Sequence, residues 1–281
     1  LKTAILDSGV DTKHGIIRQY KPKIKNFRDW INNKNGQQDL QMMDNVGHGT
    51  HVAGLVLAVA KIAHLFIGKI TDDNSLGDRD CVANAIQHAV KEWQVDIISL
   101  SFGFEDYVGS IRHAIANTDC VIFAAASNNG SNRKHAFPAN QDGVIAIHST
   151  SGQGAISSFN TQAISGEYNF SIVGEAVESA WPGLAPDGQP NMRIKSGTSF
   201  ATPIAVGVTA LIIEFLWKHL QEADRGLLKH SQTHGAITRI LKVIFVEQGP
   251  YRYIAPWAGL ERNTREEIVS KFVKTLRYGV S

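Results

Sequence analysis

Short, continuous apolar runs alternate along the first half of the chain with longer segments whose apolar residues recur at helical spacing. The short runs are rich in β-branched residues and do not alternate with polar ones, which is typical of strands buried on both faces of a parallel sheet. The runs lie at 3–6, 64–69, 95–100, 120–126 and 143–147, and the helical patterns lie at 50–60, 80–93 and 107–118. This order predicts an α/β fold with a doubly wound, mainly parallel sheet and helices on both faces.

The second half of the chain follows a different pattern. Residues 157–195 are irregular and rich in glycine, which predicts short strands and a hairpin, and a long apolar helix is predicted at 199–217. We therefore expect one large domain over 1–217 and a helical extension over 218–281 that packs on the same domain. The extension carries two amphipathic patterns, predicted as helices at 235–246 and 264–278. Asn263 is the expected cap of the second helix.

Composition and charge exclude some classes of partner. The 281 residues are 43% hydrophobic and 19% charged, so the chain can bury a large core. The net charge is only +2 and the basic residues are scattered, which disfavours binding to nucleic acid or to a membrane surface. No uncharged apolar stretch reaches the ~18 residues of a membrane span. The stretch that comes nearest, 203–217, contains Glu214.

The two cysteines and the first residue bear on the compartment. Cys81 and Cys120 are expected as free thiols, because two isolated cysteines make no metal site and a single disulfide is the less common alternative. A chain without a disulfide framework fits a reducing compartment, which slightly favours an intracellular protein over a secreted one. The sequence begins at Leu1 with neither Met nor a signal peptide, so we expect a processed form or an excised domain.

Small polar clusters lie where a doubly wound sheet performs its chemistry. Asp-Ser-Gly at 7–9, Ser-Phe-Gly at 101–103 and Ser-Asn-Asn-Gly at 127–130 each follow a predicted strand, and chemistry in such folds occurs at the carboxyl ends of strands. Two more polar positions precede predicted helices. His48 lies between two glycines, and Ser199 lies just ahead of the long apolar helix.

Together these positions supply the four groups that acyl transfer needs. Ser199 can act as nucleophile, His48 as base, Asp7 as the acid that orients the base, and Asn128 as a donor to an oxyanion. Taken singly, each has a purely structural explanation as a helix cap, a buried histidine or a turn residue. His51 lies one helical turn after His48, and we expect it to pack inward and not to react.

The polar clusters belong to longer motifs. In chain order these are "AILDSGVD", "GHGTHVAG", "SLSFG", "AAASNNG" and "SGTSFATP". The set resembles the signature blocks of subtilisin-like serine proteases, the subtilases, continuously from about residue 3 to residue 215. The order Asp, His, Ser along the chain is that of subtilisin and differs from the order in chymotrypsin or the α/β-hydrolases. The resemblance implies a subtilisin-like three-layer sandwich and a serine endopeptidase that forms an acyl-enzyme intermediate.

The resemblance also implies a role for each matching residue. Asp7, His48 and Ser199 would form the catalytic triad. Asn128 would supply the oxyanion-hole amide, joined by the backbone N–H of Ser199 and assisted by Thr198.

The substrate-binding residues are implied in the same way. Ser101, Phe102 and Gly103 would form an edge along which an extended peptide pairs through backbone hydrogen bonds. The wall of the primary specificity pocket would consist of Ala125, Ala126 and Ser127, with Ala136 as its floor. Phe102 and the alanines suggest a preference for an apolar or aromatic side chain before the scissile bond.

The chain departs from the family pattern in two places. Ser127 stands where the family usually has glycine, so its side chain would narrow the pocket or constrain Asn128. The stretch 55–63 is too short for the calcium loop of some subtilisins, so we expect no metal and no other cofactor. The expected partners are polypeptide substrates and an N-terminal propeptide or neighbouring domains outside this chain, and neither nucleic acid nor membrane.

Two other interpretations of the sequence compete with an active endopeptidase. A pseudoprotease would keep the fold as a peptide-binding module, but such relatives typically lose the Ser, His or Asn, and all of these are present. A nucleotide-binding α/β domain would carry a glycine-rich phosphate loop after a strand, and no G-x-G-x-x-G or Walker-type motif follows any predicted strand. The complete set of groups favours the active enzyme.

Overall fold

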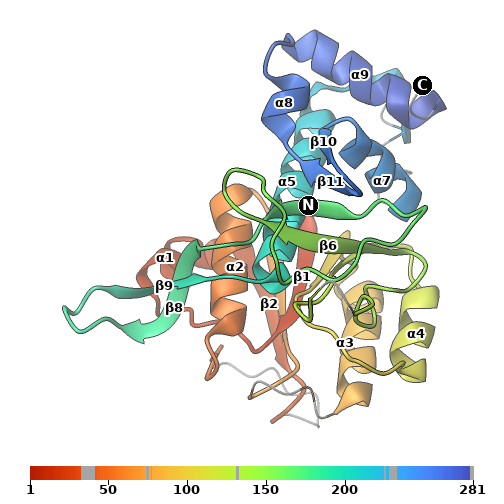
Figure 1. The fold of residues 1–281 in the computed structure, drawn as a ribbon. Helices are drawn as coiled ribbons and strands as arrows, with labels where there is room; N and C mark the ends of the chain where they lie inside the picture. The colour runs from red at the N-terminus through yellow and green to blue at the C-terminus, as the bar shows by residue number, and fades with distance from the viewer. Residues whose placement is uncertain are drawn as a thin grey trace.

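The computed structural model describes residues 1–32, 42–73, 76, 78–130, 133–224, 226–227 and 233–278. Within these residues the centre is a nine-stranded sheet of order β10-β11-β7-β6-β5-β4-β1-β3-β2, parallel at every pairing except β10 with β11 (Figure 1). Its strands are β1 (Lys2–Asp7), β2 (Ile24–Asp29), β3 (His64–Lys69), β4 (Ile97–Leu100), β5 (Val121–Ala125), β6 (Val144–Thr150), β7 (Phe170–Val173), β10 (Phe245–Gln248) and β11 (Tyr251–Ile254).

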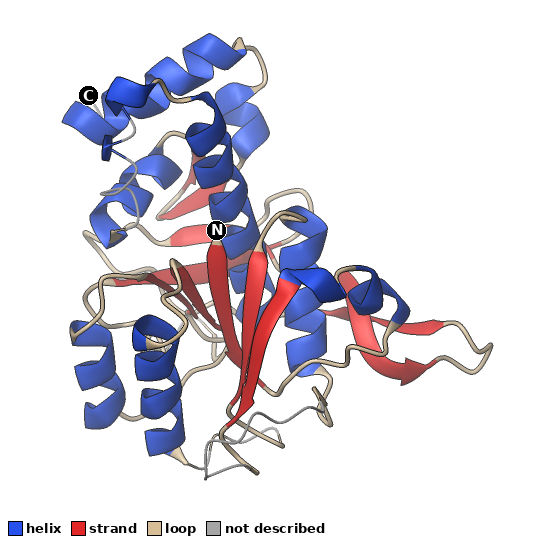
Figure 2. Cartoon of the chain, turned by 180° about the vertical axis from the view of Figure 1, so that it is seen from behind, coloured by secondary structure: helices blue, strands red, loops and turns tan. Residues whose placement is uncertain are grey.

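Helices cover both faces of this sheet. The helices α3 (Arg79–Lys91) and α4 (Gly109–Ala116) pack side by side on one face, and α2 (His48–Val59) and α5 (Thr198–His219) pack on the other (Figure 2). Shorter or later helices are α1 (Gly15–Gln19), η1 (Lys21–Lys23), η2 (Glu222–Asp224), α7 (His234–Lys242), α8 (Pro256–Leu260) and α9 (Arg265–Tyr278). The predicted doubly wound fold is therefore confirmed as three layers.

The two cores explain why the strand sequences are continuously apolar. In β1, Ile5 belongs to the core under α2 and α5, whereas Ala4 and Leu6 belong to the core under α3 and α4. In β5, Phe123 belongs to the core under α2 and α5, and Ile122 belongs to the core under α3 and α4. Every residue of β5, and every residue of β1 after Lys2, is buried, so neither face of these strands needs polar side chains.

Four strands of the sheet, β2, β7, β10 and β11, were not predicted individually from the sequence. The edge strand β2 reads IKNFRD, and its buried residues alternate with partly exposed ones. An edge strand that is covered on one face gives this mixed pattern. Because a loop can give the same pattern, the strand could not be recognised from the sequence. The strand β7 lies within the glycine-rich region at 157–195, where short strands and a hairpin were expected. That hairpin is present as a separate antiparallel pair, β8 (Val177–Leu184) with β9 (Pro190–Lys195).

The long helix α5 runs through the core. It begins at Thr198, one residue before the predicted start, and Pro203 lies in its second turn. Because proline has no N–H, the carbonyl of Ser199 lacks its helical partner. Of the described helices, α5 alone has the length and composition of a membrane span, and most of it is buried against α2 and the sheet.

The segment after α5 contains strands as well as helices. The predicted helix at 235–246 ends at Lys242, because residues 245–254 turn into the hairpin β10–β11, which adds two strands to the sheet beyond β7. The helix α9 is capped by Thr264 and not by Asn263. Thr264 Oγ1 accepts the Glu267 N–H at 3.3 Å while Glu267 Oε2 accepts the Thr264 N–H at 2.7 Å, a reciprocal capping box.

Both cysteines are free thiols, as predicted. Burial raises the pKa of the Cys81 thiol to about 12 and that of Cys120 to about 11. Neither thiol is therefore a nucleophile at neutral pH.

Candidate active site

The predicted site residues gather at the carboxyl edge of the sheet. Asp7 is the last residue of β1, and Asn128 follows the end of β5. His48 and Ser199 lie in the first turns of α2 and α5, the two helices that pack together on one face. The fold thus brings to one edge groups that are separated by up to 192 positions, the difference between 7 and 199.

Asp7 and His48 form a hydrogen-bonded pair. His48 Nδ1 lies 2.8 Å from Asp7 Oδ1, and the backbone N–H of Ser8 donates to the same oxygen at 2.8 Å. Asp7 is buried, whereas the His48 side chain is 27% exposed. Because Nδ1 donates to a carboxylate, Nε2 is the ring nitrogen left to accept a proton.

Opposing influences set the pKa of His48. Burial lowers it, because the imidazolium is poorly solvated there. The charge and the hydrogen bond of Asp7, with a further contribution from the charge of Asp44, outweigh burial and raise the pKa above 6.5. The imidazolium that forms when His48 takes a proton is therefore stabilised by its surroundings.

Ser199 lies beside this pair without a direct hydrogen bond to it. Both residues are described, and no hydrogen bond joins Ser199 Oγ to His48 Nε2. The neighbouring Phe200 packs on His48 with 5.2 Å between ring centroids, which ties the start of α5 to the start of α2. Catalytic hydrogen bonds are often long in the absence of substrate, so this geometry is compatible with a nucleophile and its base.

The side chain of Asn128 is oriented by the start of α5. Its Oδ1 accepts the backbone N–H of Thr198 at 2.8 Å, so Nδ2 is the end of the amide left to donate. Gly197 approaches this amide closely, because a Cβ added there would lie 3.1 Å from Asn128 Nδ2. The φ angle of Gly197 is 153°, a backbone conformation that a side chain would strain.

Ser127 occupies a strained backbone conformation. Its φ angle is 124°, in the region that favours glycine, and its N–H donates to Thr198 Oγ1 at 3.3 Å. Ser127, which replaces the glycine usual in the family, therefore lies at a position whose backbone conformation favours glycine.

A cleft runs along the segment Phe102–Phe104. Its larger part, about 610 Å³, is lined by Ser199 and Asn128, and its smaller part, about 230 Å³, by His48 and Asp7. The two parts share Phe102, Gly103 and Phe104, and Ser101 lines the smaller part. The predicted edge residues therefore separate two halves of one cleft.

The larger half contains most of the predicted pocket wall, with one exception. Ala125, Ser127 and Ala136 line it. Ala126 does not, because it is fully buried and its backbone bonds Ile147 and Ala136. Lining residues that the sequence did not indicate are Phe104, Glu105, Asn129, Arg133, Lys134 and His135.

His51 packs inward, as its helical spacing predicted. It is fully buried, and Nε2 donates to the backbone oxygen of Arg193 in β9 at 2.9 Å. Its ring lies 4.7 Å from that of Phe200. Burial lowers the pKa of His51 to about 4, so it is neutral at physiological pH.

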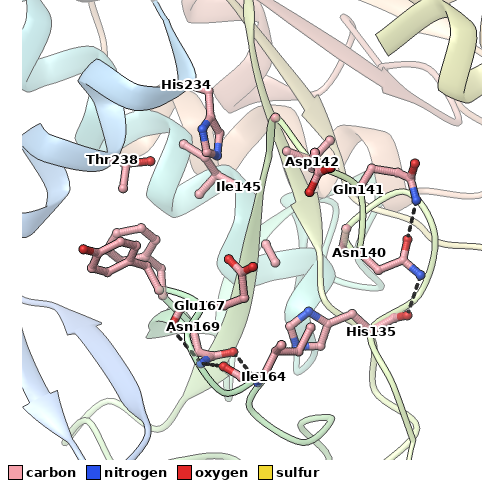
Figure 3. Close-up of a pocket in the computed structure, with 16 residues that line it drawn as sticks. His135, Asn140, Gln141, Asp142, Ile145, Ile164, Glu167, Asn169, His234 and Thr238 are labelled. Atoms are coloured by element: carbon pink, nitrogen blue, oxygen red, sulfur yellow. Dashed lines mark hydrogen bonds between the residues drawn. The ribbon is translucent and has the colours of Figure 1, made fainter. Parts of the chain in front are cut away.

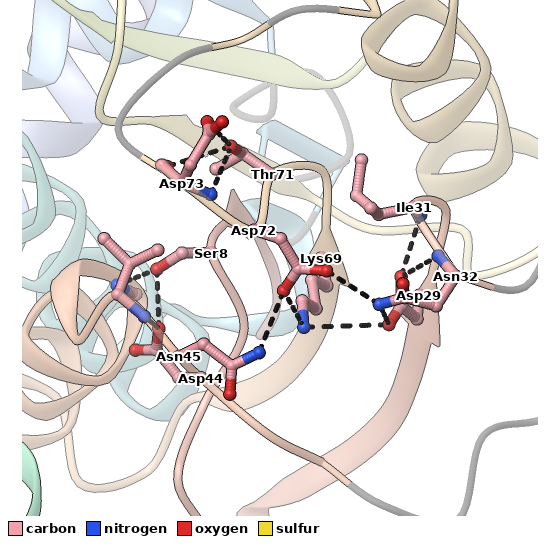
Figure 4. A network of polar contacts seen from close by, with 12 residues as sticks. Ser8, Asp29, Ile31, Asn32, Asp44, Asn45, Lys69, Thr71, Asp72 and Asp73 are labelled. Carbon is pink, nitrogen blue, oxygen red and sulfur yellow. Dashed lines mark hydrogen bonds and ion pairs between the residues drawn. The ribbon is translucent and has the colours of Figure 1, made fainter.

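Sequence reasoning missed the role of Asp44. This buried carboxylate accepts five hydrogen bonds. Oδ1 accepts from the Ser8 hydroxyl (Figure 4) and from the Val46 and Gly47 N–H groups, and Oδ2 accepts from the N–H and hydroxyl of Thr50. It satisfies N–H groups at the start of α2, where negative charge is favoured. The aspartate four positions before His48 was the available signal in the sequence.

A buried lysine continues this polar network. Lys69 Nζ lies 3.8 Å from Asp29 and also bonds Asp72, which in turn accepts hydrogen bonds from Asn32 and Asn45 (Figure 4). Burial opposes the ionisation of Asp72, but the hydrogen bonds from Lys69 and Asn32 outweigh it and lower the pKa of that carboxyl. The network joins the ends of β2 and β3 to the segment that leads into α2.

A separate hollow of about 320 Å³ lies between α7 and the start of β6 (Figure 3). It is lined by His234 and Thr238 from α7, by Asp142 just before β6 and by Ile145 within β6. His135 lines both this hollow and the larger half of the cleft. None of the four predicted catalytic residues lines it. Elsewhere too, the described residues include no group of three or more His, Cys, Asp or Glu placed to hold a metal ion.

Comparison with known sequences gives a consistent result. The model of the subtilase family matches residues 1–244. The chain is 36% identical over 227 residues to the subtilisin-like protease het-Q2 of Podospora anserina, covering 74% of this chain and 61% of that protein. It is 32% identical over 229 residues to the major intracellular serine protease of Bacillus subtilis (strain 168), covering 75% and 68%. The chain thus spans about three-fifths of the length of the first of these relatives.

Comparison with solved structures shows the same fold. The protease domain of PatA superposes with a TM-score of 0.73 at 21% identity, covering 100% of this chain and 96% of that one. A lanthipeptide protease superposes with a TM-score of 0.72 at 19% identity, covering 93% and 87%.

Proposed function

The chain belongs to the subtilase family, and from that premise we propose that it is a serine endopeptidase. Its substrates would be polypeptides, bound in extended form along Ser101–Gly103. The observation that carries the proposal is the orientation of His48. Its Nδ1 donates to Asp7, which leaves Nε2 free to act as the base.

The reaction would proceed through an acyl-enzyme. As Ser199 Oγ attacks the scissile carbonyl carbon, its proton passes to His48 Nε2, and the carbonyl oxygen becomes an oxyanion. His48 then gives that proton to the leaving amine as the C–N bond breaks. Water, deprotonated by His48, attacks the ester carbon. As the bond from that carbon to Ser199 Oγ breaks, His48 returns the proton to Oγ and the second product is released. The Asp7 carboxylate remains ionised and stabilises the imidazolium in both halves of the reaction.

Asn128 Nδ2 would donate to the oxyanion together with the backbone N–H of Ser199. The amide is already turned by its bond to Thr198, so little reorganisation is needed during the reaction. Loss of such a donor in subtilisin itself lowers the rate by about 10²–10³. The positive end of the α5 dipole would favour the same developing charge.

The catalytic unit would lie within 1–217, with 218–281 as an extension that braces it. Ala125, Ser127 and Ala136 would contact the side chain before the scissile bond and favour an apolar or aromatic one. We also propose an intracellular location, supported by the intracellular serine protease named among the relatives. A propeptide or neighbouring domains would complete the protein, consistent with the longer relatives.

A peptide-binding module without catalysis is the second candidate. The strained Ser127 and the absence of a hydrogen bond between the described Ser199 and His48 favour it. Labelling with a fluorophosphonate, read by peptide mass spectrometry, separates the two candidates. The endopeptidase predicts labelling at Ser199 that disappears in Ser199→Ala and His48→Ala. A folded wild-type chain that takes up no label would support the second candidate.

A further inference from the structure

The β8–β9 hairpin carries two basic side chains on one face. Val177 pairs with Lys195 and Ser179 with Arg193, so Arg193 and Lys195 lie two residues apart on the same side. The Ser179 hydroxyl, on that side as well, donates to the backbone oxygen of His51 at 2.9 Å. This face of the hairpin is therefore turned toward α2, beside which the hairpin extends away from the body of the protein (Figure 1).

Trp181 connects the two cations to the start of α2. The guanidinium carbon of Arg193 lies 4.5 Å from the indole centroid, and Lys195 Nζ lies 4.8 Å from it. The indole also packs so closely on Gly47 that a Cβ there would overlap it. Trp181 thus contacts the residue just before His48 and holds both cations by cation–π attraction.

Neither cation has a carboxylate partner. Across the described parts of the chain, no Asp or Glu oxygen lies within 4.0 Å of Arg193 or Lys195. The nearby Asp11 is oriented by the backbone, since its Oδ2 accepts the Gly183 N–H at 3.3 Å. Cation–π stacking uses the face of the guanidinium, so its N–H donors remain available to a ligand.

The cluster lies next to the reacting groups but outside the described cleft. Lys195 precedes Ser199 by four residues. The pKa of His48 is raised overall, but the charge of Lys195, like burial, acts to lower it. Lys195 is therefore within electrostatic range of that ring. Trp181, Arg193 and Lys195 line neither half of the cleft along Phe102–Phe104.

The direction of a bound peptide relates this cluster to the substrate. In the proposed function, residues before the scissile bond pair with Ser101–Gly103 and place a side chain in the larger half of the cleft. The residues after the bond must leave Ser199 in the other direction, away from Phe102–Phe104. The hairpin face contacts Gly47 next to His48 through Trp181, and it lines neither half of the cleft, so it is the basic surface that we assign to that side.

We propose that Arg193 and Lys195, held by Trp181, form a subsite for an acidic side chain, Glu or Asp, on the leaving-group side of the scissile bond. A carboxylate can accept two parallel N–H bonds from the Arg193 fork while Lys195 supplies a second charge. The subsite rests on the proposed function for its placement relative to the bond. It adds a substrate class that the triad and the apolar pocket do not specify.

Hydrolysis of paired peptides tests the subsite. The substrates are internally quenched peptides that differ only in Glu or Gln at one position, scanned over the first three residues after the scissile bond. At one position the wild type should prefer Glu over Gln by about tenfold in kcat/KM. Arg193→Gln and Lys195→Gln should each reduce that ratio, and the double variant should bring it close to one. Lys61→Gln, at the far end of α2, is the matched control and should keep it.

Binding to Ser199→Ala provides a measurement that does not depend on catalysis. Calorimetry should show about tenfold tighter binding of the Glu peptide than of the Gln peptide, Arg193→Gln should reduce the difference, and the double variant with Lys195→Gln should abolish it. Equal hydrolysis of the two peptides at every position would overturn the subsite while leaving the endopeptidase intact. Selective binding of the Glu peptide by a wild type that takes up no fluorophosphonate would support the subsite and overturn the endopeptidase.

Discussion

The carboxylate of Asp44 and the hydroxyl of Ser8 are joined by a hydrogen bond of 2.8 Å across 36 positions of the sequence. Ser8 Oγ also accepts the Gly49 N–H at 2.9 Å, and the Ser8 N–H donates to Asp7. The end of β1 and the start of α2 are therefore tied together at the residues that carry the proposed acid and base. Asp44 lines neither half of the cleft, so it acts on the site through Ser8 and α2.

Asp44→Asn should lower activity and shift its pH dependence. The amide replaces one acceptor oxygen with a donor that faces N–H groups, and we expect kcat/KM to fall by about 10- to 100-fold, the equivalent of about 1–3 kcal/mol. Burial lowers the pKa of His48 while Asp7 and Asp44 raise it. Without the Asp44 charge, the pKa of His48 should fall and the acid limb of the kcat/KM profile should move to lower pH.

A pH profile of kcat/KM for Asp44→Asn checks both effects, with the exposed Glu261→Gln as the control for lost charge. An acid limb that stays at the wild-type pH would contradict an electrostatic role for Asp44 at His48.

Ser127→Gly should stabilise the protein and increase its activity. A non-glycine residue at φ 124° costs about 1–3 kcal/mol, part of which is offset because glycine makes the unfolded chain more flexible. We expect the melting temperature to rise by about 2–4 °C per kcal/mol gained, and kcat/KM to rise for peptides with large apolar side chains before the scissile bond. Calorimetry and peptide hydrolysis measure these quantities.

Ser127→Ala distinguishes strain from pocket size, because it removes the hydroxyl and keeps the Cβ. Its free energy of unfolding should stay within about 0.5 kcal/mol of the wild-type value. If Ala and Gly stabilised the protein equally, the backbone at 127 would not be the source of the effect.

His148 should make the protein sensitive to acid. Its ring is fully buried between those of His135 and Tyr251, and within the described part of the chain neither ring nitrogen has a hydrogen-bond partner. Burial, with the charge of His135, lowers the pKa of His148 from 6.5 to about 3. Between these values the unfolded state binds a proton that the folded state does not. The free energy of unfolding should therefore fall as pH falls, by about 1.4 kcal/mol per pH unit from this residue.

Urea unfolding across that pH range tests the effect in His148→Phe, which keeps a planar ring without a titrating group. The slope of stability against pH should decrease by the contribution of one proton, whatever the absolute stability of the variant. The exposed His113→Gln should leave the slope unchanged. An unaltered slope in His148→Phe would exclude His148 as the source.

Thr264→Ala should destabilise α9 while Asn263→Ala should not. Thr264 Oγ1 accepts the Glu267 N–H, whereas Asn263 contributes no side-chain cap among the described hydrogen bonds. Loss of an N-cap oxygen costs about 1 kcal/mol. Thermal unfolding of the two variants compares them directly, and an equal loss in both would argue against the assignment of Thr264.

The sequence predicted what depends on local periodicity or on contiguous motifs. The strands around Ile5 and Phe123 were predicted because burial on both faces leaves an unbroken apolar run. Asp7 and His48 were singled out by motif, and their 2.8 Å hydrogen bond is compatible with the proposed pairing. The helix cap was misplaced by one residue, because Asn263 and Thr264 are both good caps and only the reciprocal bond with Glu267 decides between them.

What the sequence did not predict depends on contacts between distant segments. Asp44 reaches Ser8 only because the fold brings the end of β1 beside it, whereas its other four hydrogen bonds come from the nearby Val46, Gly47 and Thr50. Trp181 meets Gly47 across 134 positions, the difference between 47 and 181. The strands β10 and β11 are only four residues each and lie between helices, so their pairing with β7 becomes visible only when the sheet is assembled.

The β10–β11 hairpin also affects how readily two copies of the protein could pair through the edges of their sheets. It covers the backbone of β7, and the edge that it presents instead is four residues long and carries Glu247 paired with Arg252. Charged edges resist pairing with another chain, whereas β7, which has the same length but the uncharged sequence FSIV, would favour pairing once uncovered. The hairpin lies in the segment after α5. A protein truncated to the proposed catalytic unit, 1–217, would therefore expose the backbone edge of β7 to pairing with another chain. We therefore expect the C-terminal segment to protect the protein against self-association.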